Sequence, residues 1–268
     1  MTAPSPFTLH PGTAPLLISF PHVGTHVPPA LAARLTPKAR EVHDTDWHLP
    51  RLYDFARGLG ASLLIATHSR YVIDLNRPPD GASLYPGQSV TALCPVDDFD
   101  GESIHLDVTD EPGAQEIAER RAAIWQPYHD ALAAELARIK AAHGVAVLWD
   151  AHSIRSVLPR FFDGKLPDLN LGTADGASCA PELAHELLAV AESAPGFTAV
   201  LNGRFKGGHI TRAHGRPQQG VHAVQLEMTQ SSYMQEAMPF DYLPERAARI
   251  QPTLERLLQT ALAFAQRA

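Results

Sequence analysis

Short apolar runs recur along the 268-residue chain, separated by more polar sequence. Continuous apolar runs of this length are typical of β-strands that are buried inside a sheet. The pattern predicts strands at residues 16–20, 62–66, 71–75, 145–149, 199–201 and 223–226.

The segments between several of these runs have the 3.6-residue apolar period of amphipathic helices. The longest predicted helix spans residues 116–142, with an apolar stripe on one face and a C-terminal stop at Gly144. The same period predicts helices at residues 47–59, 181–192 and 244–266. Helices that alternate with buried strands favour an α/β fold, in which a mixed sheet carries helices on both faces. We expect residues 1–268 to form a single domain.

Two stretches, at residues 78–112 and 159–178, have little periodicity and are rich in Pro, Gly, Asp and Ser. Long irregular segments inside a compact domain are usually functional or mobile. Both stretches are therefore predicted to be long loops.

Composition narrows the class of protein. Hydrophobic residues make up 45% of the chain and charged residues 19%, as in ordinary globular proteins. The formal charge is −7 and no basic run stands out, which argues against a nucleic-acid partner. Only Cys94 and Cys179 are present, outside any CxxC motif, so neither a disulfide scaffold nor a thiolate zinc site is expected. The sequence has no membrane-length apolar stretch and no signal-peptide pattern, so we expect a cytoplasmic protein.

Two of the predicted strands lead into a histidine. His22 follows the run at residues 16–20, within PHVGTH, and His152 follows the run at 145–149, within DAHS. Ligands of open α/β sheets collect at the carboxyl ends of the strands. Two imidazoles that arrive there from distant parts of the chain indicate one metal or catalytic site.

A carboxylate would complete such a site, because catalytic zinc commonly takes two histidines, one carboxylate and an open position for water. Asp46, just before the predicted helix at 47–59, is the leading candidate, and Asp44 is the alternative. Asp46 would equally serve as the N-cap of that helix. Asp150 is better placed to orient a histidine through its other ring nitrogen.

The sequence also offers candidates for a general base and for anion-binding groups. The segment HAVQLE ends in Glu227, which could take a proton from a metal-bound water, although an exposed strand-end glutamate is the simpler alternative. Arginines bind carboxylates in bidentate fashion, while many surface arginines only form ion pairs. Arg70 and Arg77 flank the run at 71–75, and the glycine-rich segment NGRFKGGHITR contains Arg204 and Arg212.

Several other chemistries lack their motifs in this sequence. There is no GxSxG elbow of serine hydrolases, no GxxxxGK[ST] nucleotide loop and no HExxH metalloprotease helix.

Seven stretches of the sequence form a distinctive set from about residue 15 to residue 234: LLISFPHVGTHVP, DTDWHLPRLYDFARGLGAS, SRYVIDLNRP, LWDAHSIRS, FDGKLPDLNLGT, LNGRFKGGHITR and HAVQLEMTQSSYM. Together they resemble the N-formylglutamate amidohydrolase (N-formylglutamate deformylase) family. The resemblance implies a zinc-dependent exopeptidase-like (phosphorylase/hydrolase-like) α/β fold. It also implies metal-dependent hydrolysis of a small anionic acyl-amino acid, N-formyl-L-glutamate, to formate and L-glutamate in histidine degradation.

The resemblance further implies that His22, Asp46 and His152 hold one divalent metal, with Zn²⁺ expected. Related carboxypeptidases and acyl-amino-acid deacylases begin their metal site with His-x-x-Glu. Here the matching segment is HVGT, so that glutamate is absent and a carboxylate from elsewhere in the chain is needed.

By the same resemblance, Glu227 is similar to the late catalytic glutamate of the deacylases, and Arg70 would polarise the scissile carbonyl. Asn76 and Arg77 would hold the amino-acid carboxylate. As our own extension, Arg204 or Arg212 would bind the side-chain carboxylate. Two alternatives stay open: a zinc deacylase for another N-acyl amino acid, and a non-catalytic protein that binds a dicarboxylate.

Overall fold

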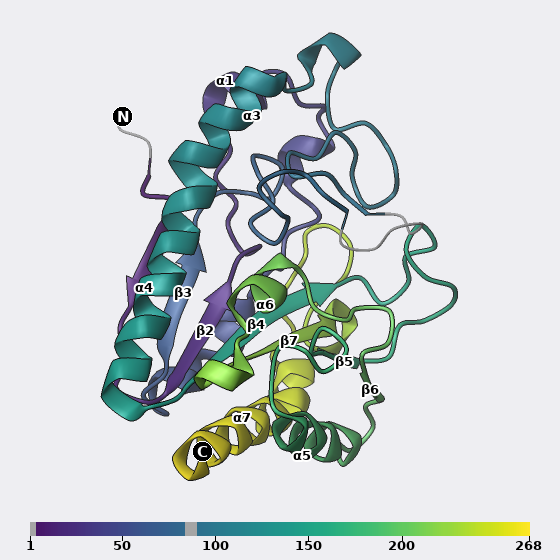
Figure 1. Ribbon diagram of the computed structural model, residues 1–268. Coiled ribbons are helices and arrows are strands. Elements are labelled where there is room, and N and C mark those ends of the chain that lie inside the picture. Colours follow the sequence, from purple (N-terminus) through teal and green to yellow (C-terminus); the bar gives the residue numbers. More distant parts are fainter. Residues whose placement is uncertain (1–3, 84–89) are drawn as a thin grey trace.

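The computed structural model describes residues 4–83 and 90–268, and this part of the chain forms a seven-stranded sheet (Figure 1). The strand order is β1-β3-β2-β4-β7-β5-β6. The strands are β1 (Phe7–His10), β2 (Leu16–Phe20), β3 (Ser62–Ala66), β4 (Ala146–Ile154), β5 (Leu169–Gly172), β6 (Ala199–Leu201) and β7 (Val221–Thr229).

The central strands β3, β2, β4 and β7 are parallel to one another. Strand β1 is antiparallel to β3, β5 is antiparallel to β7, and β6 is parallel to β5. Because parallel strands end at the same edge of a sheet, residues at the ends of β2, β4 and β7 lie close together.

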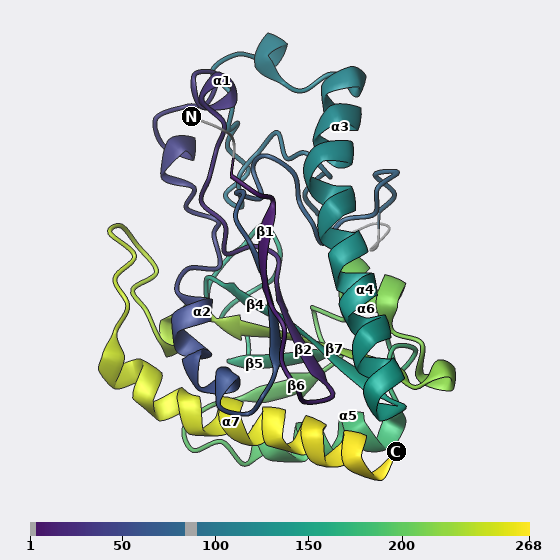
Figure 2. The same ribbon diagram turned by 90° about the vertical axis from the view of Figure 1, so that its left-hand side faces the viewer.

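Helices lie on both faces of the sheet, with α5 and α7 side by side on one face and α4 on the other (Figures 1 and 2). The helices are α1 (Pro29–Ala32), α2 (Leu49–Leu52), α3 (Ala114–Arg120), α4 (Gln126–His143), α5 (Pro181–Glu192), α6 (His209–His214) and α7 (Pro244–Arg267). The shorter helical turns are η1 (Ala39–Glu41), η2 (Asp54–Arg57), η3 (Val108–Asp110), η4 (Arg121–Trp125), η5 (Pro217–Gln219) and η6 (Gln230–Ser232).

Strand β2 contributes to a separate hydrophobic core on each face of the sheet. Leu16, Ile18 and Phe20 belong to the core beside α5 and α7, whereas Leu17 belongs to the core beside α4. This division follows from the strand geometry, since successive side chains point to opposite faces. The predicted fold class, a mixed α/β sheet flanked by helices, is confirmed.

Five of the six predicted strands are confirmed. The run at 223–226 lies inside β7, and the run at 145–149 begins one residue before β4; both strands continue through polar residues. The pattern missed the edge strand β1 and the strand β5. Since β5 lies within residues 159–178, the prediction of an entirely irregular loop there is wrong.

The strand predicted at residues 71–75 is also wrong, because this segment forms turns. Tyr71, Val72, Ile73 and Leu75 are nevertheless buried and belong to the core beside α4. Their apolar character therefore reflects burial without strand pairing.

Three of the four predicted helices are confirmed, with α3, η4 and α4 together covering residues 116–142. The helix predicted at residues 47–59 is instead the short α2 followed by η2. His48 before α2 has φ = 63° and Tyr53 after it leaves helical geometry, so one continuous helix cannot form.

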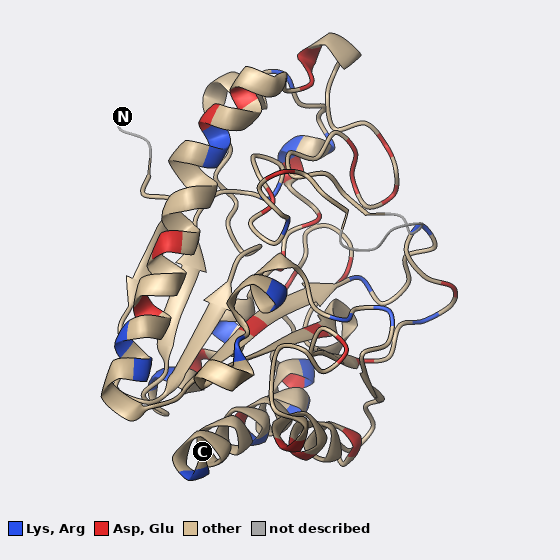
Figure 3. Ribbon diagram, in the orientation of Figure 1, with Lys and Arg blue, Asp and Glu red and all other residues tan. Residues whose placement is uncertain are grey.

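The described part of residues 78–112 is irregular as predicted, apart from η3 and isolated bridges; residues 84–89 lie outside the described residues. From α3 to α4, groups of Asp and Glu are followed by groups of Lys and Arg, while the strands carry mainly other residues (Figure 3). Among the described helices, none combines the length and apolar character needed to cross a membrane.

Gly24 lies where the chain after β2 passes the end of β3. A methyl group at Gly24 would lie 2.3 Å from the carbonyl oxygen of His68 and 2.4 Å from the carbonyl carbon of Thr67. We expect Gly24→Ala to lower the free energy of unfolding by about 1–3 kcal/mol, measured by urea denaturation, because backbone atoms must shift. Gly113→Ala is the matched control, since a methyl group there meets open space. Equal effects of the two substitutions would contradict the close-approach argument.

Candidate active site

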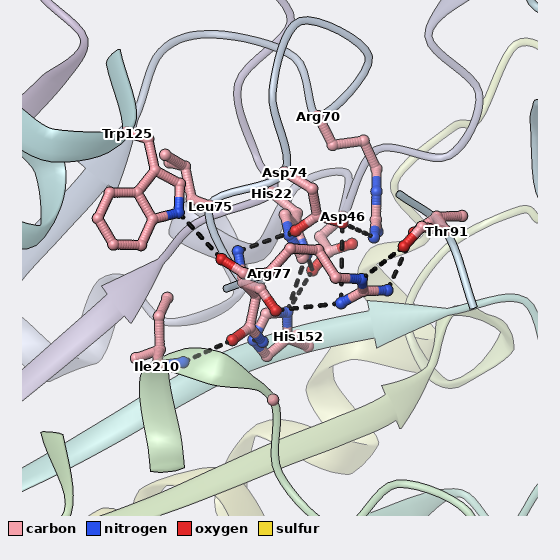
Figure 4. Close-up of polar contacts among 12 residues, drawn as sticks. His22, Asp46, Arg70, Asp74, Leu75, Arg77, Thr91, Trp125, His152 and Ile210 are labelled. Carbon is pink, nitrogen blue, oxygen red and sulfur yellow. Dashed lines mark hydrogen bonds and ion pairs between the residues drawn. The ribbon is translucent and has the colours of Figure 1, made fainter. Parts of the chain in front are cut away.

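Three buried side chains meet at the carboxyl edge of the parallel strands. His22 lies just after β2, His152 lies within β4, and Asp46 comes from the loop that precedes α2 (Figure 4). The two Nδ1 atoms of the histidines are 3.1 Å apart. Asp46 Oδ2 lies 3.3 Å from His152 Nδ1 and 3.8 Å from His22 Nδ1. Segments far apart in the sequence thus place two imidazole nitrogens and a carboxylate oxygen around one point.

These three groups fit the ligand set of a tetrahedral metal site. Ligand atoms about 2.0–2.1 Å from a tetrahedral zinc ion lie about 3.3 Å from one another. The separations of 3.1, 3.3 and 3.8 Å lie around that value. His22, Asp46 and His152 could therefore hold a metal ion.

Two further carboxylates fix how the imidazoles are oriented. Asp74 Oδ1 lies 2.7 Å from His22 Nε2, and Asp150 Oδ2 lies 3.0 Å from His152 Nε2. Carboxylates accept hydrogen bonds, so each Nε2 carries the proton in the neutral imidazole and each Nδ1 lone pair faces Asp46. Asp150 was expected to orient a histidine in this way. Asp74 was missed, because its place at the site depends on the turn at 71–75 that the apolar pattern misassigned.

The two candidate aspartates have different surroundings. Asp44 Oδ2 accepts hydrogen bonds from the Tyr71 hydroxyl and the Phe99 amide, both at 2.8 Å. Asp46 is not a helix cap, because α2 begins at Leu49 with no side-chain cap, and its Oδ2 accepts from the Ser153 amide at 3.2 Å. The structure thus brings Asp46, and not Asp44, to the histidine pair.

The electrostatics of the site favour a cation. Burial and the Arg70 guanidinium lower the pKa of His22. Burial opposes charging of His152 as well, but Asp150 and Asp46 outweigh it and hold its pKa well above the usual range. The carboxylates that stabilise a proton there would also stabilise a divalent metal.

A second group of potential metal ligands contains His43, Asp98 and Asp100. Here Lys38 Nζ already lies 3.0 Å from an Asp98 oxygen and 3.2 Å from an Asp100 oxygen. Because this ammonium group compensates the two carboxylates, the group is a weaker candidate for a metal than the His22 site.

Glu227 lies directly opposite His152 in the pairing of β7 with β4. Its side chain lines the same pocket as His22 and Asp46 and is only 8% exposed, so it is not an exposed strand-end glutamate. Burial raises the pKa of Glu227 to about 8, with Asp46 adding to the increase and His152 opposing it. This carboxyl group can therefore both accept and donate a proton near neutral pH.

Three of the four candidate arginines, Arg70, Arg77 and Arg204, line the pocket beside the histidines. Arg70 is buried, donates to Asp74 Oδ2 at 2.7 Å and stacks over the Phe99 ring. Within the described residues its Nε has no hydrogen-bond partner. Arg77 is more exposed, and its Nε and Nη2 donate to the Thr91 carbonyl and hydroxyl at 2.9 Å each.

Asn76 is buried, and both the oxygen and the nitrogen of its side-chain amide contact protein groups. Its Oδ1 accepts from the Ile210 amide at 2.8 Å, and its Nδ2 donates to Asp150 Oδ2 and Gln225 Oε1, each at 3.4 Å. A methyl group on Gly208 would come within 2.5 Å of the Asn76 side chain. Asn76 therefore joins α6 to Asp150, the carboxylate beside His152, a connection that the sequence did not indicate.

The remaining candidate arginines lie in different places. Arg204 lines the pocket of His22, and its Nε donates to the Phe161 carbonyl at 2.6 Å. Arg212 lies outside this pocket, in a hollow beside the segment 215–219, and donates to the Gly207 carbonyl at 2.9 Å.

Apolar side chains form another part of the pocket wall. Three of them are phenylalanines from segments whose sequence is irregular or glycine-rich. Phe99 comes from residues 78–112, Phe161 from residues 159–178, and Phe205 from the segment that contains Arg204. The pocket thus combines potential metal ligands, a titratable carboxyl group and guanidinium groups with an apolar wall, an arrangement suited to hydrolysis of a small anionic amide.

Comparison with known proteins assigns the chain to a family. The sequence model of the N-formylglutamate amidohydrolase family matches residues 14–234. An N-formylglutamate deformylase from Pseudomonas aeruginosa is 54% identical over 253 residues, covering 94% of each chain, and one from Pseudomonas putida is 51% identical, covering 96% of each.

Solved structures share the fold. An N-formylglutamate amidohydrolase from Ralstonia eutropha has a TM-score of 0.82 at 24% identity, covering 98% of this chain and 99% of its own. A gene product from Agrobacterium tumefaciens has a TM-score of 0.74 at 21% identity, covering 97% and 96%. On the family match and the two Pseudomonas relatives, this chain belongs to the N-formylglutamate amidohydrolase family.

Proposed function

We propose that this protein hydrolyses N-formyl-L-glutamate to formate and L-glutamate with one divalent metal, in a single catalytic domain over residues 1–268. The observation that carries the proposal is the convergence of His22, Asp46 and His152 beside buried Glu227 in an arginine-lined pocket. Support for the substrate comes from two relatives, more than 50% identical, that are named N-formylglutamate deformylase. We place the reaction in histidine degradation in the cytoplasm.

His22, Asp46 and His152 would hold the metal, through the two Nδ1 atoms and a carboxylate oxygen. This donor set suits Zn²⁺. When bound, such a metal supplies Lewis acidity and lowers the pKa of water. Asp74 and Asp150 keep the protons on the Nε2 atoms, so the Nδ1 lone pairs are free to bind it.

Glu227 would move the proton. Its carboxylate takes a proton from the attacking water while the water oxygen bonds to the formyl carbon. The same carboxyl group then gives that proton to the departing nitrogen as the C–N bond breaks. Acid–base exchange of this kind requires a pKa near the working pH, as burial provides for Glu227.

The arginines would stabilise negative charge at different points. Arg70, buried next to the metal-ligating groups, faces the oxyanion that develops on the formyl oxygen. Arg77 and Arg204 would bind the two carboxylates of the substrate. Because Arg212 lies outside the pocket, we assign the side-chain carboxylate to Arg204.

Removal of the metal should abolish turnover. We expect chelation to lower formate release from N-formyl-L-glutamate by a factor of about a hundred or more, and added Zn²⁺ to restore it. Formate is measured by a coupled dehydrogenase assay, with the dialysed, untreated protein as control. Full activity in protein shown to be free of metal would contradict the proposal.

Substitution of Glu227 should separate chemistry from metal binding. Glu227→Gln keeps the size of the side chain but cannot accept the proton, so kcat should fall by about a hundredfold or more. Metal content should remain unchanged by atomic absorption. The control is Glu182→Gln, an exposed position in α5. Normal turnover by Glu227→Gln would rule out the base assignment.

The two aspartates should differ in their effect on metal affinity. Asp46→Asn removes a charged ligand and should weaken Zn²⁺ binding at least about tenfold in a competition titration with a chromophoric chelator. Asp44→Asn, the matched control, should leave metal affinity unchanged, because Asp44 contacts Tyr71 and Phe99 instead. The reverse result would make Asp44 the ligand.

A further inference from the structure

The short segment from Asp74 to Arg77 carries three side chains that serve the site. Asp74 contacts His22, Asn76 contacts Asp150 beside His152, and Arg77 lines the pocket. This segment is a turn and belongs to no strand. Its backbone therefore needs other contacts to keep these side chains in place.

Side chains from the helical layer behind the site supply these contacts. The Trp125 indole Nε1 donates to the Arg77 carbonyl at 3.0 Å, and His129 Nε2 lies 2.9 Å from the Leu75 carbonyl oxygen. Figure 4 shows the Trp125 indole pointing toward Arg77 from the side opposite Thr91. The backbone amide of His209 also donates to the carbonyl of Asn76, at 3.3 Å.

The direction of the histidine contact follows from its partners. A carbonyl oxygen only accepts, so His129 Nε2 carries a proton, and its Nδ1 accepts from His214 Nε2 at 3.1 Å. Burial, with help from the neighbouring histidines, lowers the pKa of His129 to about 3, which keeps this imidazole neutral. The Trp125 and His129 rings are stacked with centroids 3.8 Å apart, so the two donors form one unit.

Trp125 owes its position to an irregularity in the helix. It is the last residue of η4, a π-helical turn between α3 and α4. Such turns are rare in proteins overall, and those that occur often lie at functional sites. The extra residue in the turn changes which side chains face inward. Trp125 and His129 are four residues apart on this helix, so they face the same segment.

We propose that Trp125 and His129 are positioning residues that hold the backbone from Leu75 to Arg77 and thereby place the Arg77 guanidinium for the substrate carboxylate. The guanidinium end of Arg77 is held by Thr91, so the indole fixes the other end of the same residue. The inference rests on the proposed function, in which Arg77 binds a carboxylate. Loss of the indole contact should then weaken substrate binding and leave the reacting groups in place.

The first test is Trp125→Phe, which removes the N–H donor and keeps an aromatic ring. We expect KM for N-formyl-L-glutamate to rise about three- to tenfold, with kcat within about twofold of the unchanged protein. Trp149→Phe is the matched control, since it loses a buried indole contact to the Tyr53 hydroxyl at 3.2 Å, in a different hydrophobic core from that of Trp125. We expect this control to keep its KM. An unchanged KM in Trp125→Phe would overturn the proposal.

A double-mutant cycle tests whether Trp125 acts through Arg77. In the Arg77→Ala background, Trp125→Phe should raise KM no further, whereas an equal increase in both backgrounds would contradict the proposal. If Trp125→Phe fails to fold, His129→Phe takes its place, because phenylalanine can keep the ring stacking and lacks the donor.

Hydrogen exchange tests independently of turnover whether Trp125 holds the backbone from Leu75 to Arg77. The amides of Asn76 and Arg77, both bonded to Asp74, should exchange about tenfold or more faster in Trp125→Phe. Unchanged exchange would overturn the inference whatever the kinetics show. Failure of the proposed function gives a different result, because the unchanged protein would then release no formate. Faster exchange in Trp125→Phe would still support the role of Trp125 in holding this backbone.

Discussion

Four buried carboxyl groups at one edge of the sheet govern the electrostatics of the site. Asp46, Asp74, Asp150 and Glu227 are all buried there. Ionised carboxylates away from water are costly unless cations or hydrogen-bond donors compensate them. Two imidazoles and the guanidinium of Arg70 provide part of that compensation. In the proposed enzyme a divalent metal provides the remainder. The carboxylates whose burial is unfavourable for folding would thus also favour binding of the metal.

The architecture explains how these groups meet. Parallel β2 and β4 carry the histidines to a common edge, and the register of β7 places Glu227 beside His152. The turn that contains Asp74 then lies against this edge and brings a carboxylate to His22. Secondary structure alone fixes the first two arrangements, whereas the turn depends on contacts from α4 and α6.

This difference also explains what the sequence could predict. Apolar runs that lead into polar residues predict the strands that bring His22, His152 and Glu227 together, because strand ends of a parallel sheet share one edge. The same rule failed for residues 71–75, where burial without pairing produced a false strand. The contact of Asp74 with His22 was missed for this reason. The hydrogen bonds of Trp125, Asn76 and His129 join segments that are far apart in the sequence. No local sequence pattern encodes such contacts.

In the proposed enzyme, the two Nδ1 atoms and one Asp46 oxygen bind the metal. A crystal structure of the zinc-loaded protein, with anomalous scattering data collected at the zinc edge, tests this assignment. We expect an anomalous peak about 2.0–2.1 Å from His22 Nδ1, His152 Nδ1 and an Asp46 oxygen. A peak at the group of His43, Asp98 and Asp100, or one bound through the Nε2 atoms, would contradict it.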